Sequence, residues 1–157
     1  MNSPATVRVT TLRVVAVTDA SCAIAAPEWL ARAERVHRQL RPKLRADYAG
    51  RMREVFASGA EMAVCVRGDE VVGVTVFRMA ERTHSGREMY CDDLVADDAQ
   101  RSTGVGHALV QYMETLARER ACDCLTLDSG THREQAHKFY FREGMTITAF
   151  HFVKPLR

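Results

Sequence analysis

A glycine-rich turn between a predicted strand and a predicted helix is the feature of this sequence that most directly indicates chemistry. A strand is predicted over residues 88–96, and a polar loop leads from it into a helix that opens with Gly104 and Gly106. The first N–H groups of a helix have no partner inside the helix and carry the positive end of its dipole. Glycine lets an anion approach the main chain, and Arg101 can add a charge-assisted contact. The pattern therefore indicates a phosphate or pyrophosphate site.

The same turn has other possible interpretations. Glycines often do no more than permit the backbone conformation of a turn. The alternative is therefore a helix start with glycines for its turn, a solvent-exposed Arg101 and no bound anion. A dinucleotide-binding fingerprint needs a third small residue where Leu109 stands, and the Gly-Lys-Ser/Thr of a Walker loop is absent. Neither of these two nucleotide-binding loops fits.

The composition sets the class of protein. The chain has 157 residues, enough for a single domain over residues 1–157, and 46% of them are hydrophobic. A net charge of +2 gives no reason to expect nucleic acid or anionic lipid as a partner, and no apolar run approaches the ~20 residues of a membrane span. Without a secretory signal, and with an odd number of cysteines, we expect a cytoplasmic protein with free thiols. The cysteines are Cys22, Cys65, Cys91, Cys122 and Cys124.

The elements that must position the turn follow from hydrophobic periodicity and from turn residues. The patterns predict strands, helices and a hairpin in the order strand 7–17, helices 27–40 and 44–58, hairpin 61–79, strand 88–96, helix 104–120, strand 124–127, helix 134–143 and strand 145–153. Helices that follow central strands require crossover connections, so we expect an α/β fold with a mixed sheet between helices.

Two segments together resemble one family. Residues 101–106, Arg-Ser-Thr-Gly-Val-Gly, are similar to the Q/R-x-x-G-x-G/A segment that holds the coenzyme A pyrophosphate in GCN5-related N-acetyltransferases (GNAT). Residues 136–145 resemble the A-x-x-[FL]-Y-x-x-x-G-[FM] helix of the same family. The resemblance implies a mixed, mostly antiparallel central sheet with helices on both faces, the GNAT-like acyl-CoA N-acyltransferase fold.

The resemblance also implies a site for acetyl-CoA. The expected cofactor-binding residues are those that bind pyrophosphate through main-chain amides and those where the family's strand splays to receive the pantetheine arm: Arg101, Ser102, Thr103, Gly104, Val105, Gly106 and His107, and Leu94, Val95 and Ala96.

By the same resemblance Tyr140 is the expected general acid toward the leaving thiolate. An amine that attacks a thioester must lose a proton, and the departing thiolate must gain one. A phenol, with a pKa of ~10, suits the second task. The alternative for Tyr140 is a core aromatic like its neighbour Phe139.

The base is expected among the acids of the strand that precedes the turn. Residues 90–94 are similar to the Tyr-x-Glu-Asp-Phe/Leu segment of polyamine-type members, which favours Asp92 as the base, through water or as a carboxylate that binds an ammonium group. Asp93 is adjacent, so it is expected to point to the opposite face. Glu88 is a weaker candidate, and a solvated acidic pair is the alternative. Arg133 stands where many members carry Asn.

These residues predict an acetyl-CoA-dependent N-acetyltransferase that moves the acetyl group directly to a primary amine, with a small cationic amine as the expected acceptor. A protein N-terminus or lysine is the alternative acceptor, and a coenzyme A-binding sensor without turnover is the alternative class. The histidines lack metal-ligand spacing, so no metal is expected. The last predicted strand or its edge is where a homodimer would form.

Overall fold

The central sheet of the protein has five strands in the order β1-β2-β3-β4-β5. The computed structural model describes residues 11–157. The strands are β1 (Leu12–Ala16), β2 (Ala60–Arg67), β3 (Glu70–Arg82), β4 (Gly86–Ala96) and β5 (Cys124–Leu127). Neighbours from β1 to β4 are antiparallel, and β5 is parallel to β4. The sheet is therefore mixed and mostly antiparallel, which confirms the predicted fold class.

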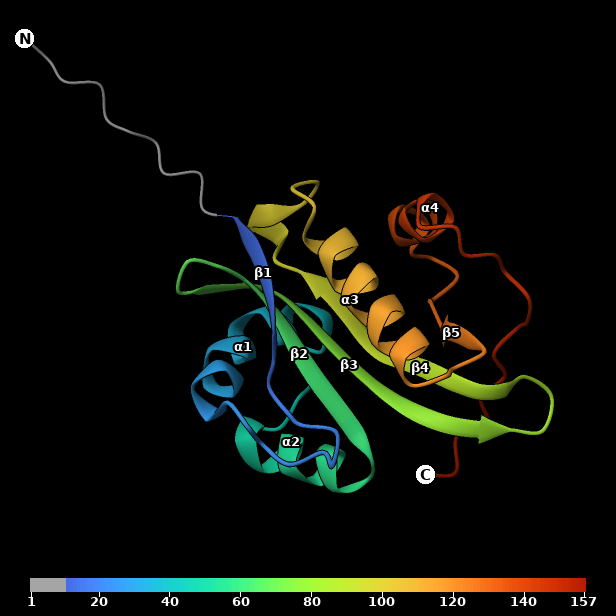
Figure 1. Ribbon diagram of the computed structural model, residues 1–157, viewed down its shortest axis with the longest axis horizontal. Coiled ribbons are helices and arrows are strands. Elements are labelled where there is room, and N and C mark those ends of the chain that lie inside the picture. Colours follow the sequence, from blue (N-terminus) through green and yellow to red (C-terminus); the bar gives the residue numbers. More distant parts are fainter. Residues whose placement is uncertain (1–10) are drawn as a thin grey trace, which may run out of the picture.

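Helices cover both faces of this sheet (Figure 1). In chain order they are α1 (Pro27–Leu40), α2 (Tyr48–Ala57), the 3-10 turn η1 (Asp98–Gln100), α3 (Val105–Glu119) and α4 (Glu134–Arg142). One face carries α1 and α2, and the other carries α3 and α4. This arrangement puts α3 and α4 together on the face opposite α1 and α2.

Local sequence explains where the helices of the first face begin. Pro27 occupies the first turn of α1, where a missing N–H costs nothing. The Asp47 side chain caps α2 by accepting a hydrogen bond from the N–H of Gly50 at 2.8 Å. Trp29, Leu30, Ala33 and Val36 form the buried stripe of α1.

The second face is held by the apolar stripe of α3. Val105, Leu109 and Met113 are at most 1% exposed. Burial of one such side chain contributes roughly 2 kcal/mol, so this contact fixes α3 and its N-terminus firmly against the sheet.

Two predicted strands differ from the structure. The first, residues 7–17, corresponds to β1, and its part before residue 11 lies outside the described residues. The last, residues 145–153, was wrong, because the segment forms no strand. Its sequence favours an extended chain, but a strand also needs an edge to pair with. The segment makes no ladder with β5, and Phe150 and Phe152 are exposed. The expected homodimer contact had rested on this strand and stays a prediction.

Candidate active site

The acidic residues of β4 lie at a bulge. In the register between β3 and β4, Cys91 pairs with Phe77 and Asp93 pairs with Val76. Asp92 therefore has no partner residue on β3 and is the extra residue of the bulge. A bulge of this kind shifts the alternation of side chains by one. Asp92 and Asp93 consequently both lie on the side of α1 and α2, and the expectation that they point to opposite faces was wrong.

Asp92 is held by a guanidinium group from the neighbouring strand. Nε and Nη2 of Arg78 both donate to the same carboxylate oxygen, Oδ2, at 2.8 and 2.7 Å. The hydrogen bonds of the described residues leave the other oxygen, Oδ1, open. Asp92 is therefore an oriented carboxylate with one oxygen available to a ligand.

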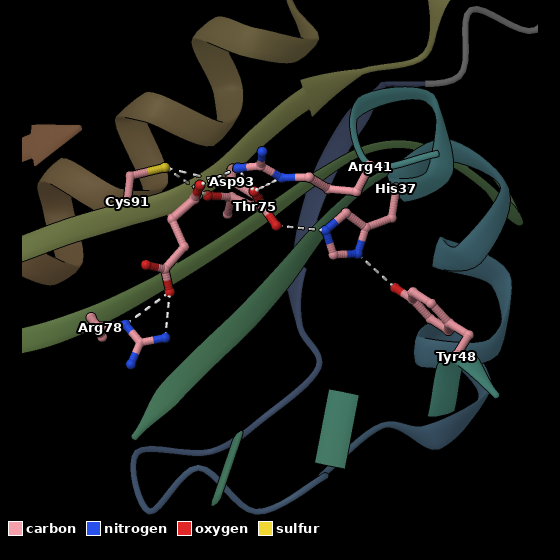
Figure 2. Close-up of polar contacts among 8 residues, drawn as sticks. His37, Arg41, Tyr48, Thr75, Arg78, Cys91 and Asp93 are labelled. Atoms are coloured by element: carbon pink, nitrogen blue, oxygen red, sulfur yellow. Dashed lines mark hydrogen bonds and ion pairs between the residues drawn. The ribbon is translucent and has the colours of Figure 1, made fainter. Parts of the chain in front are cut away.

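Asp93 is the centre of a buried network (Figure 2). Its Oδ2 lies 2.8 Å from Nε2 of His37, whose Nδ1 is 2.9 Å from the hydroxyl of Tyr48. Its Oδ1 accepts from Nε of Arg41 at 2.6 Å. Burial opposes the charge on Asp93, but its contacts with His37 and Arg41 outweigh it, so the pKa of Asp93 lies below its ordinary value. The network fastens the C-terminal end of α1 to the bulge.

The sheet opens between β4 and β5 just after the acidic bulge begins. The ladder between the two strands runs from Glu88 paired with Cys124 to Cys91 paired with Leu127, and no further. Leu94, Val95 and Ala96 still pair with β3 but have no partner on the β5 side. Their free backbone groups lie where the sequence predicts the pantetheine arm.

The start of α3 presents backbone donors. Gly104 precedes the helix with φ +88°, a left-handed conformation that suits glycine. The helical hydrogen bonds begin with the N–H of Ala108, which donates to the oxygen of Gly104 at 2.9 Å. The N–H groups of Val105, Gly106 and His107 therefore have no helical acceptor. These donors fit the diphosphate that the sequence predicts here.

Gly106 has a second role that the sequence pattern does not reveal. A Cβ at this position would lie 2.9 Å from Cζ of Phe139 on α4. The absence of a side chain therefore lets α4 approach the first turn of α3. The same contact therefore positions the helix that carries Tyr140, the predicted general acid, relative to the predicted diphosphate site.

The side chains of the glycine-rich segment are engaged with the protein itself. Nη2 of Arg101 lies 2.5 Å from Oδ1 of Asp98, Thr103 donates to the oxygen of Gln100 at 2.7 Å, and Nδ1 of His107 lies 2.8 Å from Oε2 of Glu143. Ser102 has a left-handed backbone with φ +61°. The donors that this segment leaves available for the predicted anion are thus mainly those of its main chain.

Tyr140 and Asp92 line one narrow pocket at the open end of β4 and β5. The pocket is lined by side chains from α1, β4, β5 and α4, namely Leu40, Arg41, Cys91, Asp92, Leu94, Leu127, Asp128, Arg133 and Tyr140. Burial is the main cause that raises the pKa of Tyr140, while the nearby Arg133 guanidinium lowers it by a smaller amount. The phenol is accordingly protonated at neutral pH and able to donate.

Two other groups near the site are less suited to chemistry. Burial raises the pKa of the Cys91 thiol to about 12, so the nucleophilic thiolate is not populated at neutral pH. Glu88 lies at the other end of the ladder with β5, and its carboxylate accepts from Nε of Arg82 at 3.1 Å.

Several residues of the site were not identified from the sequence. His37 was counted with the apolar stripe of α1, Arg78 was not considered, and Arg133 was noted only as a departure from the family pattern. The spacing of His37 and Arg41, one helical turn apart, is the signal that could have linked them to a common partner.

Within residues 11–157, no cluster of three or more His, Cys, Asp or Glu side chains could hold a metal ion. No helix in this part of the chain has the length and apolar character needed to cross a membrane.

A mixed sheet that opens beside the unpaired N–H groups of a helix, with a tyrosine in the opening, is the arrangement of the acyl-CoA N-acyltransferases. The chain belongs to the acetyltransferase (GNAT) family, whose model matches residues 24–145.

Two curated relatives and one solved structure illustrate the similarity. An uncharacterized N-acetyltransferase, YhdJ, of Bacillus subtilis is 36% identical over 46% of this chain and 52% of its own length. An aminoalkylphosphonate N-acetyltransferase of Salmonella typhimurium is 30% identical over 59% of this chain and 61% of its own length. The matches thus span between half and two thirds of these relatives.

The solved structure is AAC(6')-Iy in complex with the bisubstrate analogue CoA-S-monomethyl-acetylneamine. It has a TM-score of 0.75 and 11% sequence identity, with 94% of this chain and 99% of that chain covered. At this identity the similarity shows the fold.

Proposed function

We propose that the chain is an acetyl-CoA-dependent N-acetyltransferase that transfers the acetyl group directly to the primary amine of a small molecule. The observation that carries the proposal is the contact between Phe139 and Gly106. It holds α4, the helix that carries Tyr140, against the first turn of α3, whose N–H groups have no helical acceptor. Tyr140 itself lines the pocket at the open end of β4 and β5.

The residues present fit acetyl-CoA as cosubstrate. The amides of Val105, Gly106 and His107 suit a diphosphate, and the free backbone edge of Leu94 to Ala96 suits the amide groups of a pantetheine arm. When bound, acetyl-CoA supplies an activated acyl group and a thiolate as leaving group.

Two side chains of the pocket are assigned to proton movement. Oη of Tyr140 donates a proton to the leaving sulfur, which its raised pKa permits because the phenol stays protonated. Oδ1 of Asp92 accepts a hydrogen bond from the acceptor's amine and orients it, while Arg78 holds the other oxygen. A water molecule beyond Asp92 can then take the proton that the amine loses.

Direct transfer is favoured over an acyl-enzyme. Cys91 is the cysteine that lines the pocket, and its raised pKa keeps it as an unreactive thiol. Two reactants held together in one complex also react without the entropy cost of a second encounter.

A small acceptor is supported by the narrowness of the pocket and by the relative named for aminoalkylphosphonate acetylation. The sequence favours a small cationic amine because Asp92 is an acidic residue at the predicted site. Since Arg78 already pairs with Asp92, the case for a purely cationic acceptor is weaker than the sequence alone suggested.

The test measures release of free thiol from acetyl-CoA over a panel of small amines and a lysine-containing peptide, beside acetyl-CoA binding by thermal shift. We expect turnover with small amines. Double-reciprocal plots of the initial rate, measured at several fixed concentrations of the second substrate, should give intersecting lines, as a ternary complex requires. Cys91→Ala should retain activity. Binding of acetyl-CoA without turnover of any amine would instead support the sensor alternative, and parallel lines would indicate an acyl-enzyme.

A further inference from the structure

The charges that line the pocket are unusual for a site that would take a cationic ligand. Arg41 and Arg133 enter the lining from the end of α1 and from the start of α4, together with Asp92 and Asp128. Arg78 stands behind Asp92 as a third cation. A polyamine would therefore meet at least as many positive as negative groups.

The acidic groups are already paired. Asp92 accepts both hydrogen bonds from Arg78, as described above. Asp128 accepts from the hydroxyl of Tyr90 at 2.9 Å, and the same oxygen lies 2.8 Å from Nδ1 of His151. Each aspartate thus has one carboxylate oxygen held by the protein, and its Oδ1 has no protein partner within residues 11–157.

The cationic groups retain donors. Over residues 11–157, Arg133 makes no ion pair or side-chain hydrogen bond, although it stands close enough to Tyr140 to lower the pKa of the phenol. Nε and Nη2 of Arg41 contact the carboxylate of Asp93, and Nη2 also donates to the main-chain oxygen of Asp92. Nη1 therefore has no protein acceptor in that same range. The network around Asp93 holds Arg41 in place. Two guanidinium groups with open N–H donors suit a carboxylate or phosphonate, whose oxygens accept charge-assisted hydrogen bonds.

We propose that the acceptor is a small primary amine that carries an acid group, bound by Arg133 together with Nη1 of Arg41 while its amine lies at Oδ1 of Asp92. This rests on the proposed function and names its substrate class. Arg133 is then a specificity-determining residue, at the position where the sequence departs from the family pattern.

The test compares acceptors of matched length and different charge. β-Alanine and 2-aminoethylphosphonate carry an acid group, β-alaninamide is the neutral counterpart, and 1,3-diaminopropane is the cationic one. We expect kcat/KM for the two acids to exceed that of the amide by about 10- to 100-fold, the range for a charged hydrogen bond converted to a ratio. The diamine should be the poorest acceptor.

Variants of Arg133 locate the effect. Arg133→Gln should raise KM for the acidic acceptors by about 10-fold or more, with kcat and the KM for acetyl-CoA nearly unchanged. Arg133→Lys should restore part of the preference. Arg32→Gln removes an exposed arginine of α1 outside the pocket and should change nothing.

The outcomes separate this proposal from the function on which it rests. Turnover that favours the amide or the diamine, or a preference that survives in Arg133→Gln, would overturn the acid-bearing acceptor and leave the acetyltransferase intact. A rise in KM for acetyl-CoA alone would overturn it as well, because Arg133 would then serve the cosubstrate.

Calorimetry provides a readout that does not need turnover. In the presence of coenzyme A, 2-aminoethylphosphonate should bind the wild type and bind Arg133→Gln at least 10-fold more weakly. If no amine turns over, the acetyltransferase function fails while this measurement still decides the acid site. Absence of binding to the wild type would overturn the proposal.

Discussion

The carboxylate of Asp93 lies 2.8 Å from the ring of His37, and this contact joins the inner face of α1 to the bulge of β4. His37 is 1% exposed, and its other ring nitrogen contacts the hydroxyl of Tyr48 at the start of α2. One side chain thereby links both helices of this face to the strand that carries Asp92. The same carboxylate also binds Arg41, which lines the pocket. Loss of the Asp93 contacts would therefore both destabilise the fold and change the lining of the pocket.

Removal of this charge should destabilise the protein in a pH-dependent way. Asp93→Asn leaves His37 and Arg41 without their anion, and we expect a loss of about 2–3 kcal/mol in the free energy of unfolding at pH 7. The pKa of Asp93 is lowered by folding, so its contribution is complete above the unfolded value of 3.8 and is lost as the pH falls through the folded value. The difference between wild type and variant should therefore be constant from pH 5 to 8 and shrink below pH 4.

Urea unfolding across this pH range measures the effect. Asp69→Asn, an exposed acid in the hairpin turn, is the matched control and should change the free energy of unfolding by less than about 0.5 kcal/mol. A loss for Asp93→Asn that stayed equal at pH 3 and pH 7 would show that the contact does not act through the ionised carboxylate.

Tyr140→Phe should separate chemistry from binding. Loss of the phenol removes the proposed proton donor, so kcat should fall by about 100-fold or more, whereas the thermal shift given by acetyl-CoA should remain. Because burial raises the pKa of Tyr140 above its ordinary 10.0, the donor stays protonated through the mildly alkaline range. The wild-type kcat should accordingly show no loss due to Tyr140 from neutral pH to about pH 9.

Stopped assays of thiol release from pH 6 to 10 check both points. Tyr112→Phe changes a half-buried tyrosine of α3 outside the pocket and serves as the control. Equal kcat for wild type and Tyr140→Phe would assign the phenol to packing alone.

Local patterns were enough to predict the glycine-rich turn, α4 and most of the sheet, since each depends on residues close together in the sequence. The bulge at Asp92 was not predictable, because it follows from the register between β3 and β4 rather than from either strand alone. The partners of His37 were missed for a similar reason: burial on a helical stripe can be predicted, but not which distant carboxylate will meet it. The wrong strand prediction for residues 145–153 has the same cause. The β-propensity of a segment does not show whether a sheet edge is available for it to pair with.

Asp92 and Arg78 should behave as one unit. Asp92→Asn removes the negative charge of the carboxylate that orients the acceptor amine, and we expect kcat/KM to fall by about 100-fold. Arg78→Gln releases Asp92 from its fixed orientation and should cost less, roughly 10-fold, since the carboxylate remains. The double variant should be no worse than Asp92→Asn alone, because residues that act together are not additive.

A second acid–arginine pair of the same two strands, Glu88 with Arg82, provides the comparison. Glu88→Gln weakens the contact with Arg82 at the far end of the ladder and should leave kcat/KM within about twofold once the variant is shown to be folded. If the losses for Asp92→Asn and Arg78→Gln simply multiplied, their contact would not matter for catalysis.

The close approach of Gly106 to Phe139 predicts a rescue. In Gly106→Ala the new Cβ would lie 2.9 Å from Cζ and 3.2 Å from Cε2 of the ring, so the Phe139 ring, or α4 with it, must shift away from α3. We expect a loss of about 1–3 kcal/mol in the free energy of unfolding, the range for overpacked contacts, and weaker binding of acetyl-CoA. Addition of Phe139→Leu provides room and should recover most of both.

Gly104→Ala distinguishes crowding from backbone strain. Gly104 has φ +88°, and the nearest atom to an added Cβ would be Cδ1 of Leu12 at 3.7 Å, so the cost there comes from the left-handed backbone and not from a contact. Phe139→Leu should therefore fail to rescue Gly104→Ala. Thermal unfolding and calorimetric titration with acetyl-CoA measure the set of variants. Equal rescue at both positions would mean that Phe139 does not press on Gly106, and the link between the diphosphate site and Tyr140 would have to run through other residues.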